Sequence, residues 1–261
     1  MQIHCFWKIY LPKTDPIRKK ADHSHNCAYW LSLIDHQTLN RFEKTMNSSA
    51  MIKTIPFNEH VAEYEEWFEK YPFVFKSEVE AIRELLPTED NIYGIEVGLG
   101  TGKFSLELGI REGTEPSKNM RSLALNRGLE VMPGDAEHLP FKDMHYDFVL
   151  MVFCISYFND LSAAFTEAKR VLKNGGALIV GFIDKESVIG KAYERRKPFS
   201  VFYKQANFYT PDRIIMELRK IGFKDLQFSQ TLFHALDEIK ALEPAKPGYG
   251  DGSFVLIKAI K

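Results

Sequence analysis

The residues of this sequence whose types and spacing indicate chemistry are concentrated in one run, IEVGLGTGK at residues 95–103. An apolar, strand-like segment leads into the run and a helix-like segment follows it. Ligands of open α/β sheets bind at such a strand-to-helix turn. Glycines there let the backbone turn tightly and approach a ligand without a Cβ in the way. The run therefore predicts a ligand site around Gly98 and Gly100.

The glycine spacing separates three kinds of ligand. A dinucleotide site requires G-x-G-x-x-G/A, but counted from Gly98 the last position is Lys103, which argues against NAD. A phosphate-binding P-loop requires G-x-x-x-x-G-K-[ST], but here Val97 replaces the first glycine and Phe104 the hydroxyl residue. The remaining ligand is a nucleoside without phosphates, and an NAD(P)-binding oxidoreductase is kept as an alternative.

The run resembles the first motif of the class I S-adenosylmethionine-dependent methyltransferases, and further segments follow in the order typical of that family. They are GTEPS at 113–117, GDAE at 134–137, YDFVLM at 146–151 and RVLKNGG at 170–176. The resemblance covers about residues 57–261 and is closest to the small-molecule branch that includes the ubiquinone and menaquinone biosynthesis enzymes. It implies S-adenosyl-L-methionine as the cofactor.

The resemblance also implies roles for residues near the first two strands. Gly98 and Gly100 form the loop that the cofactor approaches, and Glu96 reaches toward its methionine end. Glu115 lies 19 residues after Glu96 and accepts hydrogen bonds from the two ribose hydroxyls. Each residue also has an ordinary structural alternative: turn glycines, a local salt bridge for Glu96, and a solvated strand end for Glu115.

Three further cofactor residues follow from the same resemblance. Asp135 accepts from the exocyclic amine of adenine, and Ala136 offers its backbone N–H. The backbone carbonyl of Met151 receives the ammonium group of the ligand. The alternatives are an ordinary turn aspartate for Asp135 and a core position for Met151.

The methyl acceptor is expected beside residues 184–209, the long connection after the fifth predicted strand. At about 26 residues this connection exceeds ordinary loop length, and such loops are often functional. Tyr193, Arg195 and Tyr203 are its candidate substrate residues, and Tyr64 joins them from a helix expected to close the cofactor pocket. Aromatic rings mixed with cations suit a planar or anionic small acceptor. A lid held by its own aromatic packing is the alternative.

No catalytic dyad is recognisable, and the chemistry explains why. The methyl carbon of the cofactor is activated by its sulfonium, so the protein supplies mainly alignment. No metal is required, and a base is needed only where the acceptor must lose a proton before attack. Residues 151–156 read MVFCIS and lack the [DN]-P-P-[YFW] motif of the family members that methylate base amines or glutamine amides.

The elements expected to position these residues alternate between strand and helix, which predicts an α/β fold. The family resemblance makes it a Rossmann-like, seven-stranded, mostly parallel sheet with an antiparallel last strand and helices on both faces. Residues 91–261 are predicted to form this core and residues 51–90 a helical cap. Within the cap, Ser77 and Glu80 predict a capping box that starts a helix ending before Pro87.

Residues 1–50 show no sustained periodicity. Two explanations fit: a poorly ordered extension, or upstream sequence counted as coding, with the start at Met46 or Met51. We favour the second. The set His4, Cys5, His23, His25 and Cys27 lacks the spacing of a zinc site, so no metal is expected.

Composition bounds the remaining function classes. Lys and Arg number 34 against 35 Asp and Glu, a net charge of −1, which argues against nucleic-acid binding as the main role. Three cysteines cannot form a disulfide framework in 261 residues and indicate a reducing cytoplasm. The longest apolar stretch, residues 148–158, is too short to span a membrane, and the first residues do not resemble a secretory signal.

We therefore predict a cytoplasmic S-adenosylmethionine-dependent methyltransferase that transfers a methyl group to a small-molecule acceptor by in-line displacement. A module that binds the cofactor without transferring its methyl group is the main alternative. The identity of the acceptor and the oligomeric state stay open.

Overall fold

The computed structural model describes residues 50–89 and 91–261. The predictions made for residues 1–49, a separate extension and the absence of a zinc site, lie outside the described residues. Within the described part of the chain, no helix is long and apolar enough to cross a membrane.

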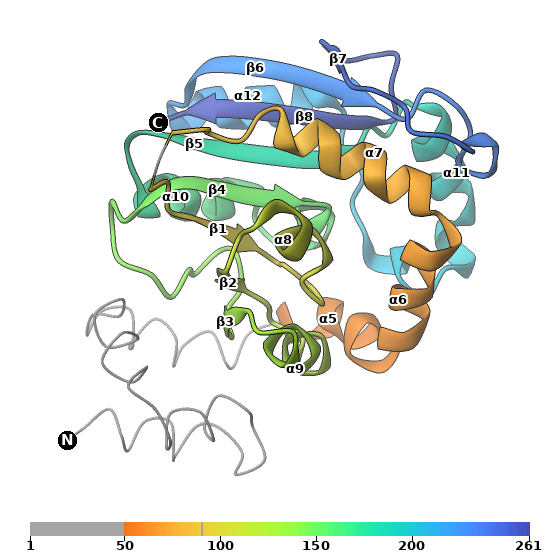
Figure 1. Cartoon of the computed structure of the whole chain (residues 1–261), viewed down its shortest axis with the longest axis horizontal. Helices are drawn as coiled ribbons and strands as arrows, with labels where there is room; N and C mark the ends of the chain where they lie inside the picture. The colour runs from red at the N-terminus through yellow and green to blue at the C-terminus, as the bar shows by residue number, and fades with distance from the viewer. Residues whose placement is uncertain (1–49, 90) are drawn as a thin grey trace.

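One mixed sheet of eight strands forms the centre, in the order β3-β2-β1-β4-β5-β8-β6-β7 (Figure 1). The strands are β1 (Gly94–Val97), β2 (Glu112–Thr114), β3 (Glu130–Met132), β4 (Tyr146–Val152), β5 (Leu172–Ile183), β6 (Lys224–Thr231), β7 (Lys246–Pro247) and β8 (Phe254–Ile260). Strands β3, β2, β1, β4 and β5, adjacent in that order, run parallel to one another. Strand β8 runs antiparallel to β5 and β6, which confirms the predicted fold class.

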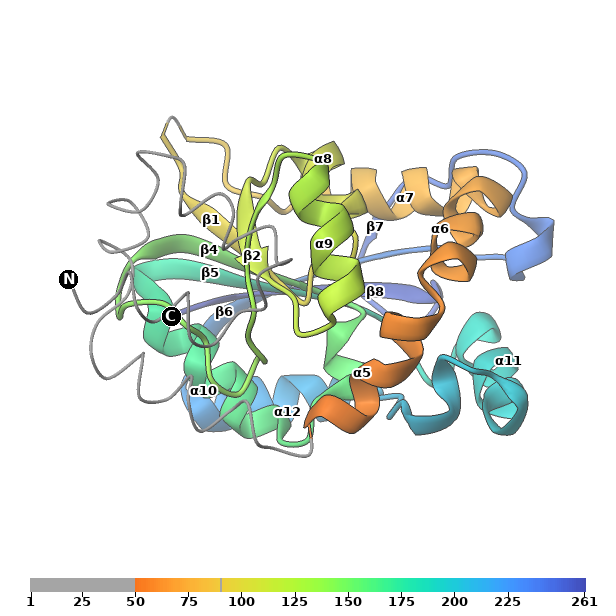
Figure 2. The same cartoon turned by 90° about the horizontal axis from the view of Figure 1, so that it is seen from below.

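Helices cover both faces of this sheet. The α-helices are α5 (Ala50–Glu59), α6 (Val61–Lys70), α7 (Pro72–Arg83), α8 (Lys103–Leu108), α9 (Lys118–Asn126), α10 (Leu161–Val171), α11 (Val188–Arg196) and α12 (Pro211–Ile221). Helices α7 and α8 pack on one face, and α10 and α12 on the other (Figure 2). Helices α5, α6 and α11 lie at the end of the sheet where the parallel strands finish (Figure 1).

The two hydrophobic cores follow from the alternation of side chains along the strands. In β4, Val149 and Met151 point into the core beneath α10 and α12. Phe148, Leu150 and Val152 point into the core beneath α7. Because β4 is covered on both faces, its sequence is almost entirely apolar, as is typical of a central parallel strand.

The helical cap differs from the predicted one at its second helix. The capping-box prediction at Ser77 is wrong, because α7 begins five residues earlier with Pro72 at a first-turn position, where its missing N–H costs nothing. Ser77 lies inside the helix, and its hydroxyl donates to the backbone oxygen of Phe73 at 2.7 Å. Helix α7 therefore starts earlier than predicted and ends at Arg83, with Glu84 as its C-cap.

Two of the connections between the main strands contain regular structure of their own. The connection 184–209 includes helix α11, which begins after Ser187, whose hydroxyl accepts from the backbone N–H of Gly190 at 3.0 Å. The segment before β8 includes the two-residue strand β7, so the sheet has one strand more than the seven predicted. Pro247 in β7 fits an edge position, because an edge strand leaves one row of N–H groups unpaired.

Candidate active site

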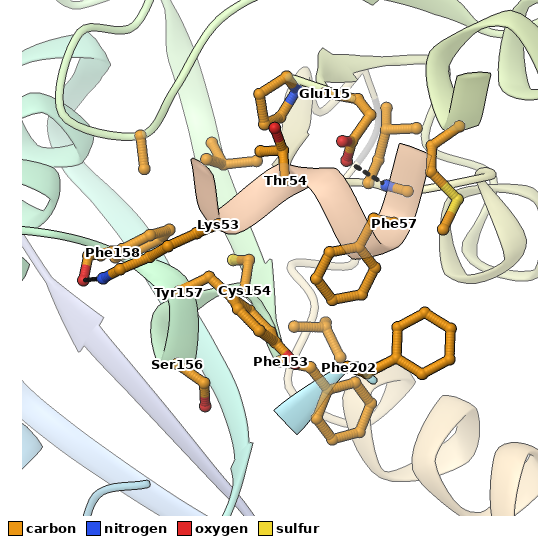
Figure 3. A pocket seen from close by; sticks show the side chains of 18 of the residues that line it. Lys53, Thr54, Phe57, Glu115, Phe153, Cys154, Ser156, Tyr157, Phe158 and Phe202 are labelled. Atoms are coloured by element: carbon orange, nitrogen blue, oxygen red, sulfur yellow. Dashed lines mark hydrogen bonds between the residues drawn. The ribbon is translucent and has the colours of Figure 1, made fainter. Parts of the chain in front are cut away.

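A pocket of about 260 Å³ opens at the ends of the parallel strands. Its walls come from the turns after β1, β2, β3 and β4, and from α5, α6, α7 and α11. Figure 3 shows α5 running across this pocket, with Thr54 and Phe57 on it and Glu115 on one side. The pocket lies where ligands of open α/β sheets bind.

The glycine loop after β1 follows a path that only glycine accepts easily. Gly98, Gly100 and Gly102 have φ values of +71°, +58° and +84°, in the left-handed region that costs other residues free energy. A Cβ at Gly98 would lie 2.7 Å from Cβ of Cys154. The loop is held to β2 by the Thr114 carbonyl, which accepts from the Gly98 N–H at 2.8 Å.

Glu115 stands directly after β2 and is buried. Its carboxylate accepts from the backbone N–H of Gly100 at 2.9 Å and from that of Ser117 at 2.7 Å. Burial raises the pKa of Glu115 to about 7, and these two N–H groups oppose the rise. The side chain thus joins the glycine loop to the N-terminus of α9 and faces the pocket.

Glu96 lies on β1, on the face that turns toward α7 and α8, and it is 1% exposed. Its carboxylate accepts from the hydroxyl of Ser105 on α8. Burial raises the pKa of Glu96 to about 8; the Ser105 hydrogen bond lowers it, and the charge of Glu115 raises it further. A carboxyl group with this pKa gains or loses its proton close to neutral pH.

Asp135 follows β3 and contributes a third buried acid to the pocket. Its Oδ1 lies 3.0 Å from Nδ1 of His138. Burial raises the pKa of Asp135, and the His138 contact opposes that rise. Ala136 lines the same wall. His138 is thus a neighbour that orients Asp135, a relationship that the sequence did not indicate.

Helix α5 is tied to the core on both sides of the pocket. The ammonium of Lys53 donates to the backbone oxygen of Phe158 at 2.9 Å (Figure 3). At the other end of the helix, Oδ1 of Asn58 accepts from the backbone N–H of Asn119 at 3.1 Å. Phe57 packs edge-on against Tyr157, with ring centroids 4.8 Å apart. Helix α5 therefore closes one side of the pocket.

Helix α6 is tied to the glycine loop through Glu65. The Glu65 carboxylate accepts from the Thr101 hydroxyl and from both terminal nitrogens of Arg127. Lys103 Nζ lies 3.2 Å from the same carboxylate. One turn of the loop and the end of α9 therefore hold α6 in place. Tyr64, the neighbouring residue, lines the pocket, and its hydroxyl lies 3.0 Å from where a Cβ on Gly100 would stand.

Aromatic rings form the opposite end of the pocket. Tyr193 of α11 and Tyr203 pack with ring centroids 4.6 Å apart, and Phe208 lies 5.7 Å from Tyr203. Phe202 contacts Phe57 of α5 at 5.3 Å. This aromatic end joins the connection 184–209 to the cap. That the methyl acceptor binds there stays a prediction.

Most of the residues predicted from the sequence meet in this one pocket. Its lining includes nine of them: Tyr64, Glu96, Gly98, Gly100, Glu115, Asp135, Ala136, Tyr193 and Tyr203. Two are not among the lining residues. The Met151 side chain is fully buried in the core beneath α10 and α12, as its structural alternative held, one position before the pocket-lining Val152. The role expected for its backbone carbonyl stays a prediction. Arg195 is exposed on α11, on a different face from Tyr193.

The pocket lining is more acidic than the sequence predicted, because we expected aromatic rings mixed with cations. Among the described lining residues, Lys53 is the one cation, whereas six are acids: Glu63, Glu78, Glu96, Glu115, Asp135 and Glu137. Sequence reasoning missed Glu78. With α7 starting at Pro72, Glu78 falls on the buried stripe of Val74 and Ala81, so the correct helix start is the signal that would have found it.

Comparison with known proteins agrees with this geometry. Residues 95–180 match the family model described as a methyltransferase domain. An uncharacterized protein of Methanocaldococcus jannaschii is 40% identical over 205 residues, 78% of this chain and 98% of that protein. A Thermotoga maritima structure, described as a SAM-dependent methyltransferase and possible histamine N-methyltransferase, is 44% identical with a TM-score of 0.77 and covers 80% of this chain and 99% of its own. The chain belongs to the class I S-adenosylmethionine-dependent methyltransferases.

The wider fold of this methyltransferase is shared at much lower identity. Haemonchus contortus phosphoethanolamine N-methyltransferase 2, solved with S-adenosyl-L-methionine, is 16% identical with a TM-score of 0.55, covering 71% of this chain and 52% of its own. That likeness concerns the fold alone. The methyltransferase is an enzyme whose cofactor is S-adenosylmethionine.

Proposed function

We propose that this enzyme transfers a methyl group from S-adenosylmethionine to a small-molecule acceptor by in-line displacement. The observation that carries the proposal is a single pocket with buried acids beside the glycine loop and aromatic rings at the other end. The Thermotoga maritima relative is described as a possible histamine N-methyltransferase, which supports a small acceptor. The motifs are closest to the quinone-biosynthesis branch, but they lie at the acidic end and leave the acceptor undecided.

The residues beside the glycine loop fit the cofactor. S-Adenosylmethionine supplies a methyl carbon activated by a sulfonium, and transfer needs alignment of nucleophile, carbon and sulfur. In our proposal Glu115 accepts from the ribose hydroxyls, since a carboxylate has about four acceptor positions and backbone N–H groups take two. Asp135 and Ala136 bind the adenine. Glu96 faces the methionine end, where a carboxylate suits a cationic ligand.

The cap has its own part in the proposed function. Side chains of α5 and α6 line the outer side of the pocket, and the Glu65 and Lys53 contacts tie both helices to the core. A closed pocket excludes water and fixes the acceptor relative to the methyl carbon. We therefore treat α5 and α6 as part of the catalytic unit.

Two measurements test the proposal. Calorimetry with S-adenosylmethionine, S-adenosylhomocysteine and NADH tests the cofactor, and we expect binding of the first two. Incubation with methyl-labelled S-adenosylmethionine and a cell extract, separated into small-molecule, protein and nucleic-acid fractions, tests the acceptor. Label in the small-molecule fraction is expected. Label confined to protein or nucleic acid would replace the proposed acceptor, and tight binding with no transfer would favour a binding module.

A further inference from the structure

Glu78 is a buried carboxyl group that the cofactor does not explain. It lies on α7, is 1% exposed and lines the pocket. Its Oε2 has no hydrogen-bond partner within the described part of the chain. Burying a polar group without a partner is costly, so a side chain in this state is a candidate for binding a ligand.

Glu78 shares the pocket lining with the rings of Tyr64, Tyr193 and Tyr203. Burial is the largest cause of the raised pKa of Tyr64, Tyr193 and Tyr203, and the charge of Glu78 adds to the rise in each of them. The carboxyl group and all three rings line the same pocket. A negative charge among aromatic faces is the arrangement that binds organic cations, because the face of an aromatic ring is itself electron-rich.

The position of Glu78 is fixed by the residue before it. The Ser77 hydroxyl accepts from the backbone N–H of Glu243 at 2.9 Å and donates to the Phe73 carbonyl at 2.7 Å. This turn of α7 is therefore attached to the segment that follows β6. A binding group needs such support to hold its geometry.

Within the described part of the chain, the pocket lining offers Glu78 no cationic partner. Lys53, the one cation of the described lining, donates to the backbone oxygen of Phe158. Arg195 and Arg196 of α11 are exposed and do not line the pocket. The expectation of an anionic acceptor, which rested on these arginines, therefore has no support in the geometry. The lining favours a cationic acceptor instead.

We propose that Glu78, together with the rings of Tyr64, Tyr193 and Tyr203, binds the amino group of the acceptor, and that the acceptor is an aliphatic amine. This inference rests on the proposed function, because it names the acceptor class of the same pocket. It adds a role for a residue that no sequence motif indicated.

The proposed contact also explains how an amine becomes nucleophilic. An ammonium group has no free electron pair, so it must lose a proton before it can accept a methyl group. Burial raises the pKa of Glu78 well above its usual range, so its ionised form binds a proton more strongly than an ordinary carboxylate does. A bound ammonium group stabilises that ionised form until the proton moves. One proton moves from the nitrogen to Glu78 Oε2, leaving a neutral amine and a neutral carboxyl group, and no other bond changes.

Calorimetry on the full chain saturated with S-adenosylhomocysteine tests the inference. The probes are three amines (n-butylamine, 2-phenylethylamine and histamine), each paired with the alcohol that replaces its amino group. We expect at least one amine to bind about tenfold or more tightly than its alcohol, the size expected for a charge-assisted contact among aromatic rings. Glu78→Gln should remove that preference and leave the affinity for S-adenosylhomocysteine unchanged.

Thermal melting of the ligand-free variants separates binding from a structural role. Because Glu78 is buried without a partner for Oε2, Glu78→Gln should melt at or above the wild-type temperature, whereas a structural carboxyl group would lower it on removal. Glu80→Gln, exposed on the same helix, is the matched control and should keep the amine preference. The inference is overturned if no amine binds better than its alcohol, or if Glu78→Gln keeps the preference. Failure of S-adenosylhomocysteine to bind the wild type would instead overturn the proposed function.

Discussion

The carboxylate of Glu115, at the end of β2, and the backbone N–H of Gly100, in the loop after β1, are joined by a hydrogen bond of 2.9 Å. The same carboxylate accepts from the Ser117 N–H at the start of α9. The side chain proposed to bind the ribose therefore also fixes the shape of the glycine loop. Replacing Glu115 should therefore lower the affinity for the cofactor in two ways, by removing a direct contact with the ribose and by releasing the glycine loop.

Glu115→Ala should weaken S-adenosylhomocysteine binding by about 1–3 kcal/mol, the cost of leaving polar partners unpaired, or roughly 5- to 150-fold in Kd. Calorimetry measures the change. Glu107→Ala, exposed on α8, is the control and should bind as the wild type does. An unchanged dissociation constant for Glu115→Ala would show that the ribose assignment is wrong.

Glu65→Ala should loosen the cap, because Glu65 ties α6 to Thr101, Lys103 and Arg127. These contacts are partly exposed, so we expect an affinity loss of about 1 kcal/mol, roughly fivefold. The loss should appear as faster dissociation of S-adenosylhomocysteine in stopped-flow measurements, since an open cap releases the ligand. Glu66→Ala changes the exposed neighbour and should have no effect. A slower association rate with unchanged dissociation would contradict the assignment of Glu65 as a closing contact.

The acidic end of the pocket was predictable because its residues follow strands whose order fixes where they meet. Glu96 stands on β1, Glu115 directly after β2, and Asp135 three residues after the end of β3. The carboxyl ends of parallel strands share one edge of a sheet. A strand position and a family motif were enough to bring them together.

The aromatic end was only partly predictable. Which side chains reach it depends on where each helix begins and on which face of the helix each residue lies. Glu78 was missed when the helix was expected to begin at Ser77 instead of Pro72. Arg195 was selected from composition, but two residues along a helix turn a side chain about 200° from Tyr193, and it lies on the exposed surface. The helical periodicity assigns residues to the buried or exposed face only once the first residue of the helix is known, and the sequence placed that residue of α7 wrongly.

Gly98→Ala should destabilise the protein more than Gly109→Ala. Both glycines have similar φ values, +71° and +74°, so both substitutions carry a backbone cost of about 1–2 kcal/mol. A Cβ at Gly109 meets nothing within 4 Å, whereas one at Gly98 lies 2.7 Å from Cys154 Cβ. The difference in free energy of unfolding, from urea titrations, reports this contact. Equal losses for the two variants would mean that the loop moves freely away from Cys154.

Removing residues 1–49 should leave the affinity for S-adenosylhomocysteine and a cooperative thermal transition unchanged, because we propose that the catalytic unit starts with α5. Removing residues 1–60 should weaken binding, since it deletes Lys53, Thr54 and Phe57 from the pocket lining and the Asn58–Asn119 contact. Calorimetry on the two truncated proteins compares them directly. Equal affinities would exclude α5 from the binding unit.

Glu96→Gln should change how the stability of the ligand-free protein depends on pH. Burial raises the pKa of Glu96 from 4.5 to about 8, so between these values the folded chain holds a proton that the unfolded chain has lost. The free energy of unfolding of the wild type therefore falls as the pH rises through this window. Glutamine does not ionise, so the variant lacks this part of the fall.

The quantity to measure is the difference between the two proteins in urea titrations at about pH 5 and about pH 8. A difference is needed because other groups also make stability depend on pH. Burial lowers the pKa of His145, so the free energy of unfolding of both proteins rises with pH near 6.5. This contribution is the same in both proteins and cancels when one is subtracted from the other. Glu96→Gln should gain stability relative to the wild type as the pH increases. Glu107→Gln, exposed on α8, should show no such gain. If Glu96→Gln instead lost stability relative to the wild type toward pH 8, the folded protein would stabilise the charged form of Glu96. A cation other than the cofactor would then have to balance that charge.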